Sequence, residues 1–436
     1  MRRFRSILVH ASAISALAVT LAPRAATQVE VPGIDKPVVV VSGRITSDTT
    51  WENDQYHVLR GTVFVEGGAR LTIEPGTTIV GETATVGTLV IARGSRIIAN
   101  GRRDAPIVFT SDQPAGQRAR GDWGGLIVNG RAPLNVSGGE AIGEGDTGVY
   151  GGDDPNDNSG ILRYVRVEFA GIEFSPDNEL NGIAFQGVGR GTVIDHVQVK
   201  MNKDDGVEFF GGTADAKHLV LTSIGDDSLD WTDGWTGRLQ FVVAQQRGDD
   251  GNNGIEADNS GDNNNLRPRS NPTIYNVTFI GDPDSNEGSE SDNGWLIREG
   301  TAGTFRNFIV MGFKEWGIAV DQTATVQQIR GGSLTLGNGI LFQNGVAEGF
   351  GHFDEDAAPF FAGNSTIRIG DPGLTAPYNH ENPNYRPRGA ATLAGGQLAP
   401  ATPPNDGFFE VTTYIGALSP DPAQDWTRGW TNFEQR

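Results

Sequence analysis

The sequence contains no cysteine among its 436 residues. This absence excludes disulfide bonds, metal sites built on thiolates and a lipid attached to an N-terminal cysteine. The folded chain must therefore be stabilised by its apolar core, by backbone hydrogen bonds and by any cations that it binds.

Lysine is also scarce. Only five lysines occur, and acidic residues outnumber lysine plus arginine by 54 to 34, which gives a net charge of −20. Such a surface repels nucleic acids and anionic membranes, so neither is expected as a partner. It repels polyanionic sugars as well, unless bound cations bridge the like charges.

Long hydrophobic runs are missing, apart from one at the N-terminus. There, Arg2, Arg3 and Arg5 precede a mostly apolar or small stretch from Ile7 to Leu21. The stretch is short for a membrane span, which needs about 20 residues, and the pattern is typical of a signal peptide over residues 1–26. We expect an exported protein that is secreted, periplasmic or on the outer cell surface, with no transmembrane segment.

The sequence also lacks any long stretch with the period of an amphipathic helix, whereas its 61 glycines and 22 prolines favour short strands joined by turns. An internal repeat is present instead, in which a small residue is followed by an apolar, a variable and a second apolar residue. The repeat occurs as Gly182-Ile183-Ala184-Phe185, Gly206-Val207-Glu208-Phe209, Ser228-Leu229-Asp230-Trp231, Gly254-Ile255-Glu256-Ala257, Gly294-Trp295-Leu296-Ile297 and Gly317-Ile318-Ala319-Val320. Successive copies are 22 to 26 residues apart, except for one step of 40 residues that contains a polar insertion.

A recurrence of this length is typical of a solenoid whose coils each contain short strands and bury their apolar faces only by stacking. We predict an all-β chain: a right-handed parallel β-helix with an N-terminal cap over residues 36–361. An extended tail, residues 362–436, is expected to pack on the helix. A β-sandwich is the rival fold, but it does not require one tetrapeptide pattern to recur at fixed spacing.

Stacking the coils by their repeats places far-separated acidic residues about 4.8 Å apart, in columns. The first turn column contains Asp204, Asp226, Asn252 and Asp292, the second contains Asn181, Asp205, Asp227, Asn253 and Asn293, and an outward strand column contains Glu208, Asp230 and Glu256. Two like charges at that spacing repel by about 0.9 kcal/mol in water and by about 3.5 kcal/mol at an effective dielectric constant of 20. Something must offset this repulsion.

Three interpretations of the columns remain open. Asp and Asn cap backbone amides in turns, so the columns can be purely structural. Oxygen ligands from Asp, Glu and Asn also suit Ca²⁺ rather than zinc, and the predicted Ca²⁺ ligands are Asp204, Asp205, Asp226, Asp227 and Asp292. The third interpretation is catalysis by paired carboxylates.

Two motifs carry a resemblance to known proteins. The segment Gly121-Asp122-Trp123-Gly124-Gly125, together with Trp426-Thr427-Arg428-Gly429-Trp430 near the C-terminus, resembles a poorly characterised family of secreted or lipid-anchored bacterial β-helix proteins. The fold that the resemblance implies is also that of the pectate lyase and polygalacturonase superfamily. A shared fold does not imply a shared activity, and this chain has no cysteine for a lipid anchor.

The catalytic candidates are Lys203, Asp204, Asp226 and Asp227. The carboxylates resemble those on successive coils of polygalacturonases, but the next coil has no histidine and the chain contains no Arg-x-Lys. A lyase would need a base near a Ca²⁺ ion. Lys200 and Lys203 are close to the acidic columns in sequence, and Arg267 and Arg269 are alternatives.

Two functions follow from these residues. The first is a non-enzymatic protein that binds glycan or a surface component along the acidic, Ca²⁺-binding flank, through Glu208, Asp230, Glu256 and the ring of Trp235. Trp295 and Trp316 are further candidates for stacking on sugars, although each could equally belong to the core. The second function is a polysaccharide lyase or glycoside hydrolase with an atypical site. Neither the ligand nor the oligomeric state follows from the sequence.

Overall fold

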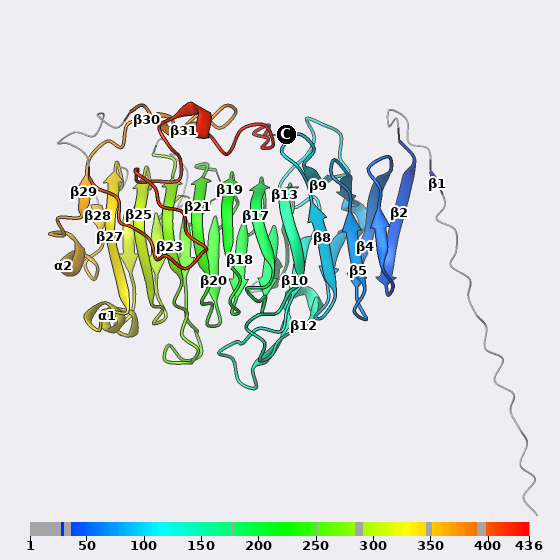
Figure 1. Cartoon of the computed structure of the whole chain (residues 1–436), viewed down its shortest axis with the longest axis horizontal. Coiled ribbons are helices and arrows are strands. Elements are labelled where there is room, and N and C mark those ends of the chain that lie inside the picture. The colour runs from blue at the N-terminus through cyan, green and yellow to red at the C-terminus, as the bar shows by residue number, and fades with distance from the viewer. Residues whose placement is uncertain are drawn as a thin grey trace, which may run out of the picture.

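The chain folds into a right-handed parallel β-helix, which confirms the predicted fold (Figure 1). The computed structural model describes residues 28–29, 36–175, 178–249, 251–283, 291–345, 351–389 and 398–435. The predicted signal peptide lies outside these residues. Across the described chain, no helix is long and apolar enough to cross a membrane.

One sheet of the solenoid is built from the repeated tetrapeptide. Its strands are β7 (Thr88–Ile91), β10 (Gly125–Asn129), β16 (Ile183–Gln186), β18 (Val207–Phe210), β20 (Leu229–Thr232), β22 (Ile255–Ala257), β24 (Trp295–Ile297), β26 (Trp316–Val320) and β28 (Gly351–Phe353). Val207 of β18 is in register with Leu229 of β20, which is in register with Ile255 of β22. The preceding small residues also stack, because the amides of Val207 and Leu229 donate to the carbonyls of Ser228 and Gly254. The register predicted from the repeat is therefore present.

The other walls are formed by the remaining strands of the large sheet. The early strands are β2 (Val38–Ile45), β3 (Thr49–Trp51), β4 (Tyr56–Val65), β5 (Arg70–Ile73), β6 (Thr78–Gly81), β8 (Arg96–Asn100) and β9 (Ile107–Ser111). The later strands are β13 (Gly160–Glu168), β17 (Val193–Lys200), β19 (Ala216–Thr222), β21 (Arg238–Gln245), β23 (Thr273–Ile280), β25 (Gly303–Met311), β27 (Leu334–Phe342) and β29 (Ile367–Ile369). Strand β4 reaches from these walls into the first sheet, because it pairs with both β6 and β7.

Seven of the long strands bend at one residue with a left-handed backbone. These residues form the bend column: Tyr164, His196, His218, Phe241, Asn276, Asn307 and Asn338, with φ between 48° and 63°. Each falls where the strand register skips a position, as at Tyr164 and His196 between β13 and β17. The bend turns one strand into two faces of the solenoid.

The solenoid interior is a continuous apolar core along the stack. Aromatic rings stack between coils within it: Phe209 lies 5.2 Å from Phe185 and 4.4 Å from Trp235, measured between ring centroids. One coil buries its apolar side chains only against the next, so the coils are stabilised together.

Insertions and short helices lie on the outside of the solenoid. These elements are β11 (Glu140–Gly143), β12 (Gly148–Gly151), β14 (Ile172–Ser175), β15 (Asn178–Leu180), α1 (Thr323–Arg330), α2 (Ala358–Phe361), η1 (Thr83–Thr85), η2 (Glu144–Asp146) and η3 (Pro422–Gln424). At the N-terminal end, β1 (Gln28–Val29) pairs antiparallel with β2. The β11–β12 hairpin brings Tyr150 into a separate apolar cluster with Ile127 and Ala184 on the outer face of the first sheet.

The last coil extends beyond the boundary predicted at residue 361, because β29 pairs in parallel with β27 after the short helix α2. The chain then forms the hairpin of β30 (Leu374–Ala376) and β31 (Asn384–Pro387) and returns along the solenoid (Figure 1). Trp426 and Trp430 are buried in a second apolar cluster between this returning tail and the solenoid wall.

Candidate functional site

The outward column of the first sheet changes from apolar to acidic along the stack. Ala184 on β16 is in register with Glu208, and Glu208 is followed by Asp230 and then Glu256 on successive strands. Glu208 is 9% exposed and Asp230 is 8% exposed. These carboxylates point away from the apolar core but are still withdrawn from solvent.

The two turn columns lie beside the start of the same strands. The amide of Asp227 donates to Asp205 Oδ1 at 3.0 Å, and the amide of Asn253 donates to Asp227 Oδ1 at 2.5 Å. One oxygen of each aspartate thus joins one turn to the next, as the structural interpretation requires. That role leaves the second carboxylate oxygen of each residue for other partners.

The three columns converge on one pocket of about 310 Å³. The residues that line this acidic pocket are Glu144, Glu179, Asn181, Asp204, Asp205, Glu208, Asp226, Asp227, Asp230, Asn252 and Glu256. Nine of them carry carboxylates, and none of these lining residues is lysine, arginine or histidine. Glu144 comes from η2 in the β11–β12 hairpin and Glu179 from β15, so two insertions contribute acids to the site.

Burial and mutual repulsion raise the pKa of these carboxyl groups. Burial, together with Asp226, raises the pKa of Asp204 to about 8. Burial next to Asp258, partly offset by Arg298, raises the pKa of Glu256 to about 7, and burial next to Glu179 does the same for Glu144. The pKa values of the innermost acids, among them Asp230, are raised well above the usual range, chiefly by burial.

The oxygens are close enough together to share cations. In three groups, one oxygen from each residue lies within 4.8 Å of the others: Asp204, Asp205 and Asp226; Asp205, Glu208 and Asp230; Asp227, Asp230 and Glu256. Asp230 belongs to two of these groups, and its Oδ1 is buried with no hydrogen-bond partner among the described residues. Oδ1 of Asn181, which is 2% exposed, is unpartnered in the same way. An all-oxygen donor set with unpartnered oxygens fits Ca²⁺.

One positive side chain reaches the rim. Arg298 forms ion pairs with Glu256 and with Asp258, the latter at 3.0 Å. Arg298 contacts the acids at the Glu256 end of the column and is not itself among the residues that line the pocket.

The lysines proposed as bases lie elsewhere. Lys203 is exposed and lines a separate cleft with Arg118 and Arg247, beside the returning tail. Lys200 is fully buried, with its Nζ 4.0 Å from Glu168 and 4.8 Å from the centroid of the Phe169 ring. Neither lysine is therefore among the residues that line the pocket with Asp204, Asp226 and Asp227.

Two other predicted residues also lie outside the pocket. Asp292 continues the turn column, since its amide donates to the carbonyl of Asn252, but it is not part of the pocket lining. Trp235 is fully buried and stacks on Phe209, and Trp295 is also fully buried. Neither indole reaches the surface that a sugar would contact, because both rings fill the core. The expectation of a sugar platform at Trp235 is corrected accordingly.

Sequence reasoning missed Glu144 and Glu179. Both lie in insertions between coils, outside the repeat, so no alignment of the repeats could place them over the acidic columns. An unusually acidic insertion next to a β-helix coil is the only signal in the sequence.

The comparisons with known proteins agree with the architecture. A family model described as a pectate-lyase like beta helix domain matches residues 43–360, which include every coil that lines the acidic pocket. No match was found among curated proteins or among solved structures. The match covers well over half of the chain, and the chain belongs to the family of pectate-lyase-like β-helix domains.

Proposed function

We propose that this is an exported, carbohydrate-related β-helix protein that binds Ca²⁺ in its acidic pocket and, through that ion, binds acidic polysaccharide without cleaving it. The observation that carries the proposal is the unpartnered Oδ1 of Asp230 inside a pocket of nine carboxylates. Removing a buried carboxylate from water costs several kcal/mol unless an opposite charge compensates. A divalent cation provides that charge and uses the ligand type that the pocket offers.

The ligand class follows from charge. A chain with a net charge of −20 repels a polyuronate, and the pocket repels it most strongly. Ca²⁺ reverses this locally, because it is a divalent cation that takes six to eight oxygen ligands. Carboxylate or hydroxyl oxygens of a sugar can complete its coordination. Binding is therefore expected only when both the cation and an acidic polymer are present.

Calcium titration of chelator-treated protein tests the cation. We expect binding with a Kd below about 1 mM and a rise in Tm that follows saturation. Glu208→Gln and Asp230→Asn should each weaken binding at least about tenfold, because each removes a ligand charge. Glu355→Gln, at an exposed position on the surface, is the matched control and should bind as the wild type does. Absence of any Ca²⁺-dependent change in Tm or heat would refute the cation site.

Polysaccharide binding is tested separately. Polyuronates and neutral glucans should be compared in pull-down assays with Ca²⁺ and with a chelator. We expect retention on polyuronate only with Ca²⁺, and loss in Asp230→Asn. If Ca²⁺ binds but no acidic polymer is retained, the cation site stands and the proposed ligand class falls.

One observation favours the enzymatic alternative, a polysaccharide lyase or glycoside hydrolase. The raised pKa of Asp204, about 8, would keep a proton on this carboxyl at neutral pH, as a general acid requires. No lysine, arginine or histidine lines the pocket among the described residues, so a lyase base is missing there. New reducing ends or unsaturated uronates from any polymer in a broad panel, lost in Asp204→Asn, would replace the binding proposal with this one.

A further inference from the structure

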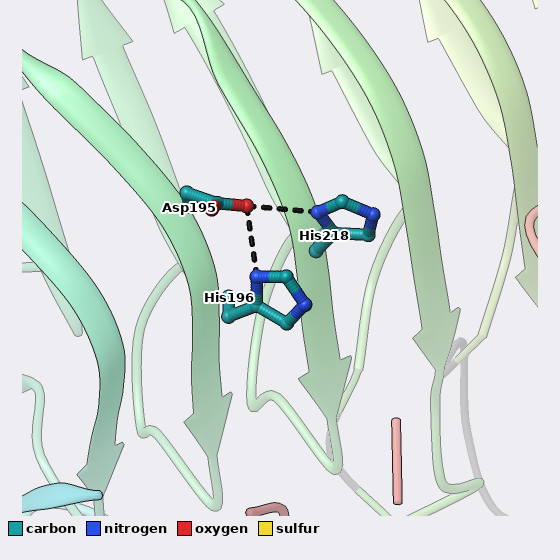
Figure 2. Close-up of side chains that lie close together, drawn as sticks. All are labelled: Asp195, His196 and His218. Atoms are coloured by element: carbon teal, nitrogen blue, oxygen red, sulfur yellow. Dashed lines mark hydrogen bonds and ion pairs between the residues drawn. The ribbon is translucent and has the colours of Figure 1, made fainter. Parts of the chain in front are cut away.

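A second cluster of metal-ligating side chains lies on a different wall of the solenoid. Asp195 and His196 come from β17, and His218 comes from the next strand of that wall, β19. Figure 2 shows both imidazoles turned toward one carboxylate oxygen: Nδ1 of His196 is 2.9 Å and Nδ1 of His218 is 2.8 Å from Asp195 Oδ1. All three ligand atoms lie within 4.8 Å of one another.

The backbone explains why the two rings meet. His196 and His218 occupy the bend column, each with φ of 56°, and their ring centroids lie 4.1 Å apart. The same column continues with Tyr164 before them and Phe241 after them, stacked at 4.4 Å and 5.0 Å. Aromatic side chains other than histidine, such as Phe241, therefore satisfy the packing at these positions. Histidine at two adjacent positions, beside an aspartate, adds donors that packing does not require.

The surroundings fix and enclose the three donors. Arg163 Nε lies 3.3 Å from Asp195 Oδ2, which leaves Oδ1 for the imidazoles. Trp430 of the returning tail contacts His196 edge-on at 5.6 Å, and Trp426 contacts His218 at 5.0 Å. The facing charged groups are Arg163, the pair of Lys217 and Glu410, and Asp195 itself. Arg163 therefore orients the carboxylate, and the two indoles cover the imidazoles.

We propose that Asp195, His196 and His218 form a site for a zinc-class transition-metal ion beneath the C-terminal tail. Two imidazole nitrogens and one carboxylate suit Zn²⁺ rather than Ca²⁺. At zinc–nitrogen distances of about 2.0–2.1 Å, tetrahedral ligand atoms lie roughly 3.3 Å apart, so the two nitrogen–oxygen distances of 2.9 and 2.8 Å would each lengthen on binding. On binding, each neutral ring carries its proton on Nε2 instead of Nδ1, and water supplies the fourth ligand.

Titration of chelator-treated, full-chain protein with Zn²⁺ in excess Ca²⁺ tests the site. The Ca²⁺ is added to compete with Zn²⁺ for the acidic pocket, a step that rests on the proposed function, and the Asp230→Asn control reports any remaining contribution of that pocket. We expect one Zn²⁺ per chain, a change in tryptophan fluorescence from Trp426 and Trp430, and a tetrahedral visible spectrum with Co²⁺. His218→Phe copies the neighbouring Phe241 position and should retain the ring stack while weakening Zn²⁺ binding at least about 100-fold. Asp230→Asn, in the acidic pocket, is the control and should leave Zn²⁺ binding unchanged.

The outcomes separate clearly. Failure of the folded wild type to bind Zn²⁺ under these conditions overturns the proposal, as does an unchanged affinity in both His218→Phe and His196→Phe. If either variant fails to fold, Asp195→Asn retains a hydrogen-bond acceptor and removes the charged ligand, and its Zn²⁺ affinity decides the question. Loss of Ca²⁺ binding alone bears on the acidic pocket and leaves this site standing.

Discussion

At the scale of single residues, Asp230 is a buried acid of the acidic pocket whose carboxylate Oδ1 has no partner among the described residues. It is stacked between Glu208 and Glu256, and it is 8% exposed. A hydrophobic residue at this position would be stabilising for the solenoid alone, as Ala184 and Leu296 are at the ends of the same column. A carboxylate here costs stability and is explained best by a ligand.

Asp230→Asn is predicted to stabilise the metal-free protein. The amide replaces a buried carboxyl group whose ionisation is opposed by burial and by two neighbouring acids, so the free energy of unfolding at pH 8 in a chelator should rise by about 1 kcal/mol or more. Urea unfolding followed by circular dichroism measures this change. With saturating Ca²⁺ the order should reverse, and the wild type should be the more stable protein. A variant that is less stable than the wild type in both conditions would show that Asp230 acts as a structural residue.

At the scale of elements, the residues of the bend column have two structural roles. It turns the long strands, and its side chains hold the returning tail. Nδ2 of Asn276 donates to Thr412 Oγ1 at 3.0 Å and to the carbonyl of Tyr414 at 3.1 Å, and Nδ2 of Asn307 donates to the carbonyl of Ala401 at 2.9 Å. Asn tolerates the left-handed backbone better than most residues. Asparagine thus both adopts the backbone conformation that the bend needs and donates the hydrogen bonds that attach the tail.

Trp430→Ala is predicted to release the tail and leave the coils folded. The indole is 1% exposed and its Nε1 donates to the carbonyl of Trp426, so truncation removes about 3–5 kcal/mol of local packing. Hydrogen exchange should speed up across residues 414–433 and stay slow in β18 and β20. Val411→Ala, at a tail position that is 73% exposed, is the control and should exchange as the wild type does. Equal acceleration in the tail and the coils would instead mean that the two unfold as one unit.

At the scale of the whole molecule, the charge is unevenly distributed. Acidic side chains gather on one sheet, in a chain that already has a net charge of −20, whereas the tail-facing wall contains paired cations such as Arg238 with Asp215 and Asp406. The stability of the molecule should therefore depend on pH and on divalent cations through the acidic pocket.

Metal-free protein is predicted to lose stability as the pH rises from about 4 to 8. Asp and Glu titrate near pH 4 in the unfolded chain, whereas Glu144 and Glu256 titrate at about 7 and Asp204 at about 8 in the folded protein. The folded state binds more protons than the unfolded state over this interval. The stabilisation that these protonated carboxyls provide is therefore complete below about pH 4 and is lost as the pH rises through the folded pKa values. Calorimetry in a chelator should show Tm falling across the interval.

The same scans supply the control for this pH dependence. Added Ca²⁺ should raise Tm more at pH 8 than at pH 5, because protonated carboxyls bind the ion poorly. The double variant Glu208→Gln with Asp230→Asn should show a flatter pH profile in the chelator. A wild-type Tm that rises steadily between pH 5 and 8 without metal would contradict the prediction.

The sequence by itself determined the fold and the register of the coils. The tetrapeptide repeat predicted that Glu208, Asp230 and Glu256 would be stacked neighbours, because side chains at equivalent positions of successive coils lie one strand spacing apart. It also indicated which residue of each tetrapeptide points inward, since strand side chains alternate between faces. Such information is local and periodic, and a repeat displays it directly.

Only the tertiary structure decided what lies between and over the coils. In the structure, Glu144 and Glu179 line the acidic pocket, Lys203 lines another cleft, and Trp235 is buried in the core. The tertiary structure also brought Trp426 and Trp430 over His196 and His218, more than 200 residues earlier in the chain. Insertions and the tail follow no period, and their positions depend on which apolar surfaces they cover. That is a property of the assembled solenoid, which no single coil of the sequence contains.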